Sequence, residues 1–146
     1  MKAVLQRVIR GSVQVADKTV SAIDQGVVIL LGVAAGDTAE DAAYLAKKTA
    51  TLRIFEDESE KMNLSLLDVK GEALVVSQFT LSADCRRGTR PSFSKAAPAA
   101  EAESLYEEYV RCLRKEQVVV KTGVFQTMMQ VNIVNDGPVT IILESK

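Results

Sequence analysis

The segment Ser77-Gln78-Phe79-Thr80-Leu81 brings two hydroxyl groups and an amide together at the end of an apolar run, Ala73 to Val76. A serine or threonine hydroxyl is a weak nucleophile at its ordinary pKa and needs a neighbouring base. The chain contains no histidine, the usual base in such pairs. We therefore expect the segment to position a substrate and to donate hydrogen bonds to a developing oxyanion, not to attack covalently. The alternative is a polar strand end with Phe79 buried in the core.

The composition also bears on metals and nucleic acids. Cys85 and Cys112 stand 27 positions apart without CxxC spacing, and histidine is absent, so we expect no zinc site, no disulfide framework and no cofactor. A formal net charge of −1 does not favour binding to a polyanion over a wide surface. Any contact with nucleic acid is therefore expected to be local.

A second candidate segment, Asn135-Asp136-Gly137-Pro138, separates the apolar runs Met128 to Val134 and Val139 to Leu143. Asn, Asp and Gly accept positive φ angles and Pro fixes φ, so the segment predicts a turn between two strands. A bond that precedes proline is also where the uncommon cis isomer occurs. A cis Gly137-Pro138 unit would hold two carbonyl oxygens in a fixed array that carries no bulky side chain.

A basic stretch follows the first segment, and we call residues 84–95 the basic loop. Its four cations against one acid, Asp84, give a net charge of +3, in a stretch that also contains Gly, Pro and Ser. We interpret it either as a solvated surface loop or as a loop that contacts phosphates at the mouth of a pocket formed by Ser77 to Thr80. The cations are Arg86, Arg87, Arg90 and Lys95.

Phe125 and Met129 stand four residues apart. This spacing is typical of a stripe of core residues on one face of an element. The two side chains could instead form the wall of a pocket in which a base stacks.

Strands and helices must position these segments. From Ala3 to Leu31, apolar residues interrupted at Gly11, Asp17-Lys18 and Gly26 predict consecutive short strands joined by tight turns. Further strand candidates are Leu52 to Phe55, Leu64 to Val69, Ala73 to Val76 and Val118 to Val120.

Two helices are expected between the strands. Gly36-Asp37 leads into one of them, because Thr38 and Asp41 have capping-box spacing, and Pro98 is placed where a second helix could begin. The sequence therefore predicts an α+β fold over a single domain, residues 1–146, with a curved, barrel-like, mostly antiparallel sheet and two main flanking helices.

The N-terminal segment lacks the features of a targeting signal. Arg7 and Arg10 interrupt any apolar stretch that a signal peptide would need. The longest apolar run, Val27 to Ala35, is too short to span a bilayer. We expect a cytoplasmic protein with no membrane partner.

The chain resembles the D-aminoacyl-tRNA deacylases of the D-tyrosyl-tRNA deacylase type. The resemblance is carried by Ser77-Gln78-Phe79-Thr80-Leu81 and by Asn135-Asp136-Gly137-Pro138-Val139-Thr140, in the family's order, and the opening residues Met1 to Val8 are similar to the family's first strand. It implies hydrolysis of the ester of D-aminoacyl-tRNA, a chiral proofreading step in translation. The implied partners are aminoacyl-tRNA and a second copy of the chain in a homodimer.

The resemblance also implies roles for individual residues. Gly137 and Pro138 of one subunit, joined by a cis bond, would enter the pocket of the other and select the configuration of the amino acid. Ser77, Gln78, Phe79 and Thr80 would hold the ester and the terminal adenosine. Phe125 and Met129 match pocket positions of the family, and Arg7 on the first strand would have a supporting role close by. The charge of the basic loop makes Arg86 and Arg87 the candidate tRNA contacts.

The mechanism that we expect is attack by water assisted by the substrate's 2′-hydroxyl, with L-amino acids rejected sterically and glycyl-tRNA accepted. A rival hypothesis is a non-catalytic module that binds RNA ends or nucleotides. A third is an amidase with Thr80 as nucleophile, which lacks an evident base. The sequence leaves open the preferred D-amino acids and tRNAs, the dimer, the cis bond and any regulation.

Overall fold

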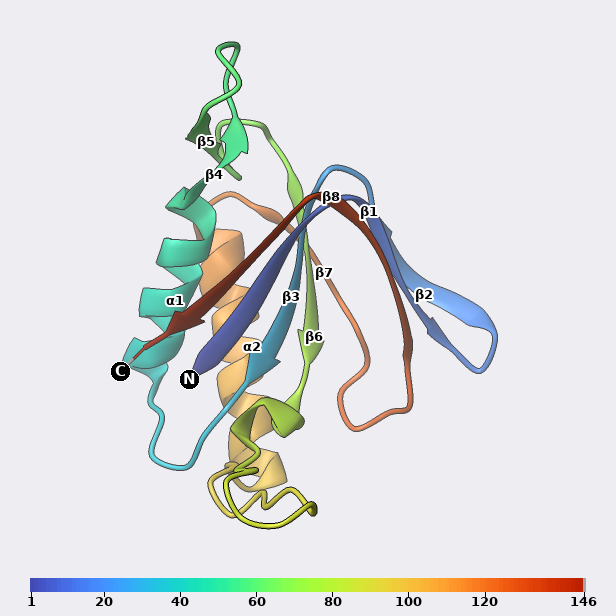
Figure 1. Cartoon of the computed structure of the whole chain (residues 1–146), viewed down its shortest axis with the longest axis vertical. Helices are drawn as coiled ribbons and strands as arrows, with labels where there is room; N and C mark the ends of the chain where they lie inside the picture. Colours follow the sequence, from blue (N-terminus) through green and yellow to red (C-terminus); the bar gives the residue numbers. More distant parts are fainter. Residues whose placement is uncertain (146) are drawn as a thin grey trace.

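Strand β1 (Lys2–Val15) is the centre of the sheet, because it pairs with three other strands. In the computed structural model, which describes residues 1–145, the strand order is β2-β1-β3-β6-β7, and β8 also pairs with β1 (Figure 1). The pairings of β1 are antiparallel, whereas β3–β6 and β6–β7 are parallel. The other strands are β2 (Lys18–Ile23), β3 (Gly26–Gly32), β4 (Arg53–Glu56), β5 (Met62–Ser65), β6 (Glu72–Ser77), β7 (Val119–Thr122) and β8 (Gln130–Glu144).

The curvature of the sheet follows from two long strands that run side by side. β8 pairs with β1 from Lys2 to Gln14, and both strands arch over the shorter ones in Figure 1. The first half of β1 pairs with β3 and its second half with β2. The expected α+β fold with a curved, mostly antiparallel sheet is confirmed.

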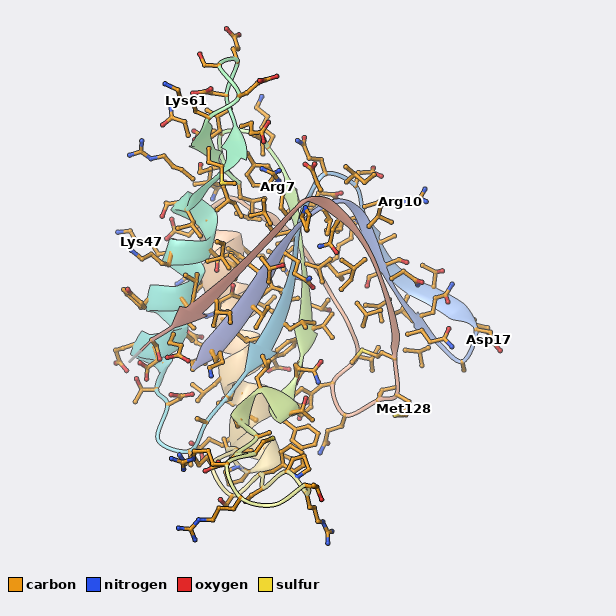
Figure 2. All side chains as sticks on the ribbon, viewed as in Figure 1. Arg7, Arg10, Asp17, Lys47, Lys61 and Met128 are labelled. Carbon is orange, nitrogen blue, oxygen red and sulfur yellow. The ribbon has the colours of Figure 1, made fainter. Side chains whose placement is uncertain are left out.

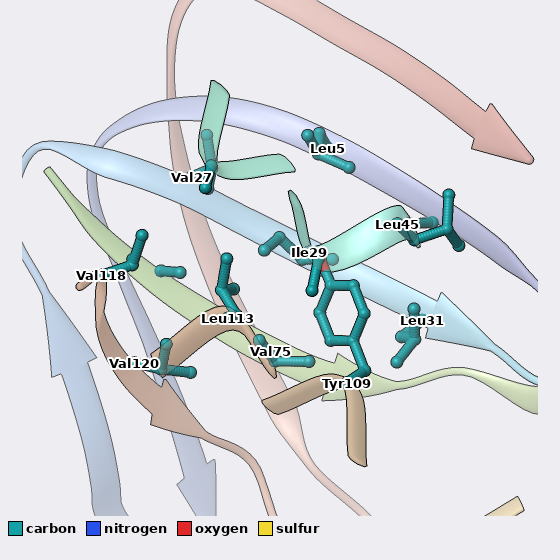
Figure 3. Packing of buried hydrophobic residues seen from close by; sticks show 14 of the residues in the cluster. Leu5, Val27, Ile29, Leu31, Leu45, Val75, Tyr109, Leu113, Val118 and Val120 are labelled. Carbon is teal, nitrogen blue, oxygen red and sulfur yellow. The ribbon is translucent and has the colours of Figure 1, made fainter. Parts of the chain in front are cut away.

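The apolar run of β3 is buried on both faces of the sheet. Val27, Ile29 and Leu31 belong to the core beneath the helices (Figure 3), whereas Val28 belongs to a second cluster on the other face. An uninterrupted apolar run is typical of a strand covered on both sides. The second cluster is enclosed by side chains of β1, β2, β6 and β8.

Helices α1 (Ala39–Thr51) and α2 (Ala99–Lys115) lie on the same face of the sheet (Figure 1). The expected capping box is present, since Thr38 and Asp41 satisfy each other's backbone N–H groups. α2 follows Pro98, as expected. The hydroxyl groups of Thr49 and Tyr109 share a buried hydrogen bond of 2.8 Å between the two helices. Within residues 1–145, neither helix is long and apolar enough to cross a membrane.

The predicted break at Gly11 is wrong, because β1 continues through it to Val15. A Cβ added at Gly11 would lie only 2.7 Å from Val28 Cγ2. Glycine therefore permits a close approach inside the strand, and does not mark a turn. The expected strand Leu64 to Val69 is also shorter than predicted, since β5 ends at Ser65 and a turn follows.

The predicted turn at Asn135-Asp136-Gly137-Pro138 is wrong as well, because β8 runs from Gln130 to Glu144 without interruption. The segment forms a bulge in this strand: Val8 pairs with Asn135 and Gln6 pairs with Thr140, so four residues of β8 stand opposite Arg7 alone. The residues that favour turns therefore form a bulge within the β1–β8 pairing, which continues on both sides of it.

Candidate active site

Ser77 is the last residue of β6, where the chain leaves the sheet and forms the short 3-10 helix η1 (Phe79–Ser82). The Gln78 N–H donates to the Leu31 carbonyl at 2.8 Å, which ties the segment to the end of β3. Ser77, Gln78 and Phe79 line a cavity of about 640 Å³. The segment that the sequence indicated therefore borders a concave space.

The connection between β7 and β8 forms another wall of this cavity. Phe125 and Met129 both line it, as expected for pocket residues. Their other sides pack against the two core clusters, Phe125 against the helix side and Met129 against the opposite side. Phe125 and Met129 thus contact core residues on one side and line the cavity on the other.

Tyr106 supports the Phe125 wall from α2. The two ring centroids are 5.9 Å apart, and the Tyr106 hydroxyl donates to the Val75 carbonyl at 2.8 Å. Burial raises the pKa of Tyr106 to about 12. Tyr106 is thus a neutral structural side chain near pH 7, and it supplies no base to the cavity.

Small side chains form a wall that the sequence analysis did not identify. They come from the residue directly after β3, from the residues just before α2 and from the first turns of α2, and they leave the space that larger residues would fill. The signal in the sequence that indicates this wall is the alanine-rich stretch around Pro98. The residues are Val33, Ala96, Ala97, Ala99 and Ala102.

Phe79 does not lie in the core, so the alternative based on its burial is wrong. Its side chain is 57% exposed, and its ring lies 5.1 Å from that of Phe93 in the basic loop, measured between centroids. An exposed aromatic pair therefore stands at the rim of the cavity.

The Thr80 hydroxyl accepts a hydrogen bond of 2.5 Å from the Gln78 side-chain amide. Gln78 is its only hydrogen-bond partner within residues 1–145, so no carboxylate or amine is in place to remove its proton. Thr80 is exposed on η1 beside the cavity. This geometry suits a hydroxyl that donates to a ligand better than an activated nucleophile.

Two backbone donors are unused at the start of η1. The first N–H groups of a helical turn have no partner within that turn, and those of Phe79 and Thr80 donate to no other group in the described part of the chain. They lie beside Ser77 at the cavity, where an oxygen of a ligand could accept from them.

The Gly137-Pro138 bond is cis, and both residues are exposed on the bulge of β8. Gly137 has a φ of +124°, in the region that favours glycine. A Cβ added there would lie 3.1 Å from Arg7 Nη2 and 3.0 Å from Val139 Cγ2. The bulge therefore requires glycine for its conformation and for its packing.

Arg7 holds the bulge from beneath. Its side chain is almost fully buried, and Nε donates to the Asp136 carbonyl at 3.1 Å while Nη1 donates to the Ile54 carbonyl at 2.7 Å. Nε also lies 3.4 Å from Asp136 Oδ2, and Nη2 lies 3.8 Å from Glu56 Oε1. Arg7 thus connects β1, β4 and the bulge of β8.

Within one chain, the bulge and the cavity are separate. Neither Arg7 nor Gly137 nor Pro138 lines the cavity. Figure 2 shows Arg7 near the crest of β1, whereas Met128, which lines the cavity, lies at the opposite end of the sheet. The two motifs found in the sequence are therefore not brought together by the fold of one chain.

The basic loop is closed by a bridge between Asp84 and Ser92. Arg86 forms a bidentate ion pair with the Asp84 carboxylate, and this hydrogen bonding lowers the pKa of Asp84 to about 2. Arg86 lines a depression next to the cavity, together with Leu81 and Ser82, and does not line the cavity itself. Arg87 is exposed and has no ion-pair partner in the described residues.

No cluster of three or more His, Cys, Asp or Glu side chains that could hold a metal occurs among residues 1–145. Cys85 and Cys112 are both free thiols.

Comparisons with known proteins identify the family of the chain. The family model described as D-Tyr-tRNA(Tyr) deacylase matches residues 4–144. A D-aminoacyl-tRNA deacylase of Syntrophotalea carbinolica is 58% identical over 145 residues, which cover 99% of this chain and 97% of the relative.

Two solved structures extend the comparison. One named c-Myc DNA Unwinding Element Binding Protein is 45% identical, with a TM-score of 0.94 over 100% of this chain and 99% of its own. A probable eukaryotic D-amino acid tRNA deacylase shares the fold at 17% identity, with a TM-score of 0.82 over 98% of each chain. The chain belongs to the D-Tyr-tRNA(Tyr) deacylase family of enzymes.

Proposed function

We propose that this chain hydrolyses the ester that joins a D-amino acid to the 3′-terminal ribose of tRNA. The observation that carries the proposal is the apolar cavity bordered by Ser77, Gln78 and Phe79, with the N–H groups of Phe79 and Thr80 unused beside it. Membership of the deacylase family gives the class of substrate. The cavity takes the terminal adenosine and the aminoacyl group.

The attacking group is water, and the substrate's own 2′-hydroxyl assists it. The lack of a base at the Thr80 hydroxyl supports this assignment, because an unactivated threonine is a poor nucleophile. The N–H groups of Phe79 and Thr80 donate to the oxyanion that forms on the ester carbonyl. A contact of this kind is typically worth about 2.7–4 kcal/mol in the transition state.

The active unit is a homodimer in which Gly137-Pro138 of one protomer enters the cavity of the other. Support comes from the exposure of both residues and from their absence from the cavity of their own chain. The carbonyls of Gly137 and Pro138 hold the α-ammonium of the substrate. The side chain of an L-amino acid is then directed into Gly137-Pro138, which we call the Gly-Pro wall, whereas the side chain of a D-amino acid points into open space.

Rejection of this kind is steric, so few contacts read the D-side chain itself. Glycine places only hydrogen where an L-side chain would collide with the wall. The enzyme therefore hydrolyses glycyl-tRNA as well, while L-alanyl-tRNA is spared by at least about 100-fold, or roughly 2.7 kcal/mol.

The test is a side-by-side deacylation series with D-alanyl-, glycyl- and L-alanyl-tRNA, with and without a chelator. Loss of the first two esters and survival of the third is the expected result. If glycyl-tRNA survives as well as L-alanyl-tRNA does, the site reads the D-side chain positively and the steric account is wrong. Tight binding of all three tRNAs without any ester loss would support a non-catalytic RNA-end-binding module instead.

A further inference from the structure

The Phe79–Phe93 pair is an unusual feature of the surface beside the cavity. Phe79 is 57% exposed and Phe93 is 37% exposed, and their rings lie 5.1 Å apart at an interplanar angle of 59°. Phe79 lines the cavity, whereas Phe93 lies outside its lining. The pair therefore extends from the cavity rim onto the basic loop.

The backbone around Phe93 fixes the ring in this place. Asp84 and Ser92 exchange two backbone hydrogen bonds of 2.8 and 3.0 Å directly before it, and the Ala96 N–H donates to the Phe93 carbonyl at 3.0 Å directly after it. The Lys95 carbonyl accepts from the Ala35 N–H at 3.0 Å, which anchors the end of the loop to the segment after β3.

The charge around this pair is strongly positive in a chain whose net charge is −1. The basic loop carries a net +3, and in Figure 1 it lies beside η1 at the lower end of the molecule. Arg86 is engaged by Asp84, but Arg87 and Arg90 form no ion pair within residues 1–145. Cations next to exposed aromatic rings are the combination with which proteins bind single-stranded nucleic acid.

We propose that the Phe79–Phe93 pair stacks with the base of the nucleotide that precedes the terminal adenosine, while the basic loop contacts its phosphate. This inference rests on the proposed function, because it assumes that the terminal adenosine occupies the cavity. The chain of the substrate then leaves the cavity across Phe79, and the next base reaches Phe93. Phe93 is a positioning residue for the acceptor end and does not touch the ester.

The first experiment compares two substrates that carry the same D-amino acid on the same adenosine. One is D-alanyl-tRNA, and the other is 3′-O-D-alanyl-adenosine, which has no preceding nucleotide. Stacking of one base on an aromatic ring is worth between about fivefold and 150-fold in affinity. Phe93→Ala should raise KM for the tRNA about tenfold with little change in kcat, and should leave kcat/KM for the adenosine ester unchanged.

Phe93→Trp and Phe93→Leu separate stacking from apolar packing. The tryptophan variant should keep the wild-type KM, whereas the leucine variant should resemble Phe93→Ala. Equal loss of activity on both substrates would show that Phe93 acts only through the structure of the cavity. An unchanged KM for the tRNA would overturn the inference equally.

A binding measurement keeps the test independent of turnover and of the folding of variants. Fluorescence anisotropy measures the affinity of the wild-type protein for two uncharged RNA stems. One ends in the natural single strand, and the other is abasic at the penultimate nucleotide. Wild-type protein should bind the abasic RNA about tenfold more weakly than the natural RNA. Phe93→Ala should bind both RNAs with the same weak affinity. If wild-type protein hydrolyses neither ester but shows this difference, the proposed function fails and the stacking site stands. If it hydrolyses both esters and binds both RNAs alike, only the stacking site fails.

Discussion

The cavity beside η1 and the Gly137-Pro138 bulge on β8 are built in opposite ways. The cavity is concave, lined mostly by apolar and small residues, and its polar groups at Ser77 to Thr80 are partly or fully exposed. The bulge exposes Gly137 and Pro138, neither of which has a large side chain, and the buried Arg7 guanidinium holds it. A tolerant recess suits substrates of varying size, whereas a rigid protrusion suits the exclusion of one configuration. The proposed function assigns acceptance of the substrate to the cavity and rejection of L-amino acids to the bulge, which lie in distant parts of one chain.

The largest expected effect comes from Gly137→Ala, because the added Cβ would meet Arg7 and Val139 at a φ of +124°. Deacylation of D-alanyl-tRNA should fall by at least about 100-fold, since misplacement of a positioning group by about 1 Å is enough for such a loss. Single-turnover kinetics give the measurement. The matched control is Gly36→Ala, where φ is +85° but the added Cβ would meet nothing within 4 Å. Equal losses in both variants would contradict a special role of the bulge.

The same variant tests the division between protomers. Gly137→Ala is unfolded and refolded together with Ala99→Trp, a variant whose added side chain fills the cavity. Each variant alone should have almost no activity. If the wall acts across the dimer, half of the dimers are mixed and hold one intact site of two, so about a quarter of the activity returns. No recovery in a mixture that demonstrably exchanges subunits would mean that cavity and wall act within one chain.

Arg7→Ala should destabilise the fold and also disturb the geometry of Gly137-Pro138. It removes the donors to the Ile54 and Asp136 carbonyls, and a hydrogen bond from a charged group is worth about 1.5–3 kcal/mol. We expect a loss of about 2–4 kcal/mol in the free energy of unfolding, measured with urea, and a marked rise in the hydrolysis of L-alanyl-tRNA relative to D-alanyl-tRNA. Arg10→Ala, on the same strand but exposed, should change stability by no more than about 0.5 kcal/mol. If Arg7→Ala hydrolyses D-alanyl-tRNA and L-alanyl-tRNA in the same ratio as the wild type, Arg7 has no role in selectivity.

On the cavity side, Thr80→Ala should lower kcat by about tenfold without abolishing turnover, because the proposed function gives its hydroxyl the task of positioning the ester and no base lies beside it within residues 1–145. Rapid-quench kinetics with D-tyrosyl-tRNA measure the loss. An acyl group trapped on Thr80 during wild-type turnover, visible by mass spectrometry, would restore the nucleophile hypothesis.

The smallest effect is expected at the basic loop. Replacing both Arg86 and Arg87 with alanine should weaken tRNA binding a few-fold and reduce the slope of log affinity against log salt by up to about 2, since each lost phosphate contact contributes about 1. Lys47→Ala and Lys61→Ala remove exposed cations from other parts of the surface (Figure 2) and serve as the control. An identical salt slope in all variants would make the arginines ordinary surface residues.

Sequence patterns predicted the structure correctly where neighbouring residues determine it. The capping box at Thr38 and Asp41 and the position of Ser77 at the end of a buried strand both followed from neighbouring residues. The apolar run of β3 likewise indicated a strand without showing that each face has its own core.

Long-range pairing explains what could not be predicted. Gly11 and the segment from Asn135 to Pro138 carry the residues of turns, yet both lie inside long strands, because β1 and β8 pair on either side of them. The separation of Gly137-Pro138 from the cavity of its own chain is also a property of the whole sheet, and no local pattern encodes it.

Arg7 has a consequence for the way this chain can change during evolution. Functional groups commonly reduce the stability of the protein that carries them, so that mutations which improve stability tend to impair activity. Here one guanidinium joins β1, the Ile54 carbonyl of β4 and the bulge of β8. Loss of Arg7 would therefore lower the stability of the fold and disturb the geometry of Gly137-Pro138 together, so the two requirements do not conflict at this residue. A substitution at Arg7 should thus be detectable as a loss of stability even where deacylation is not required.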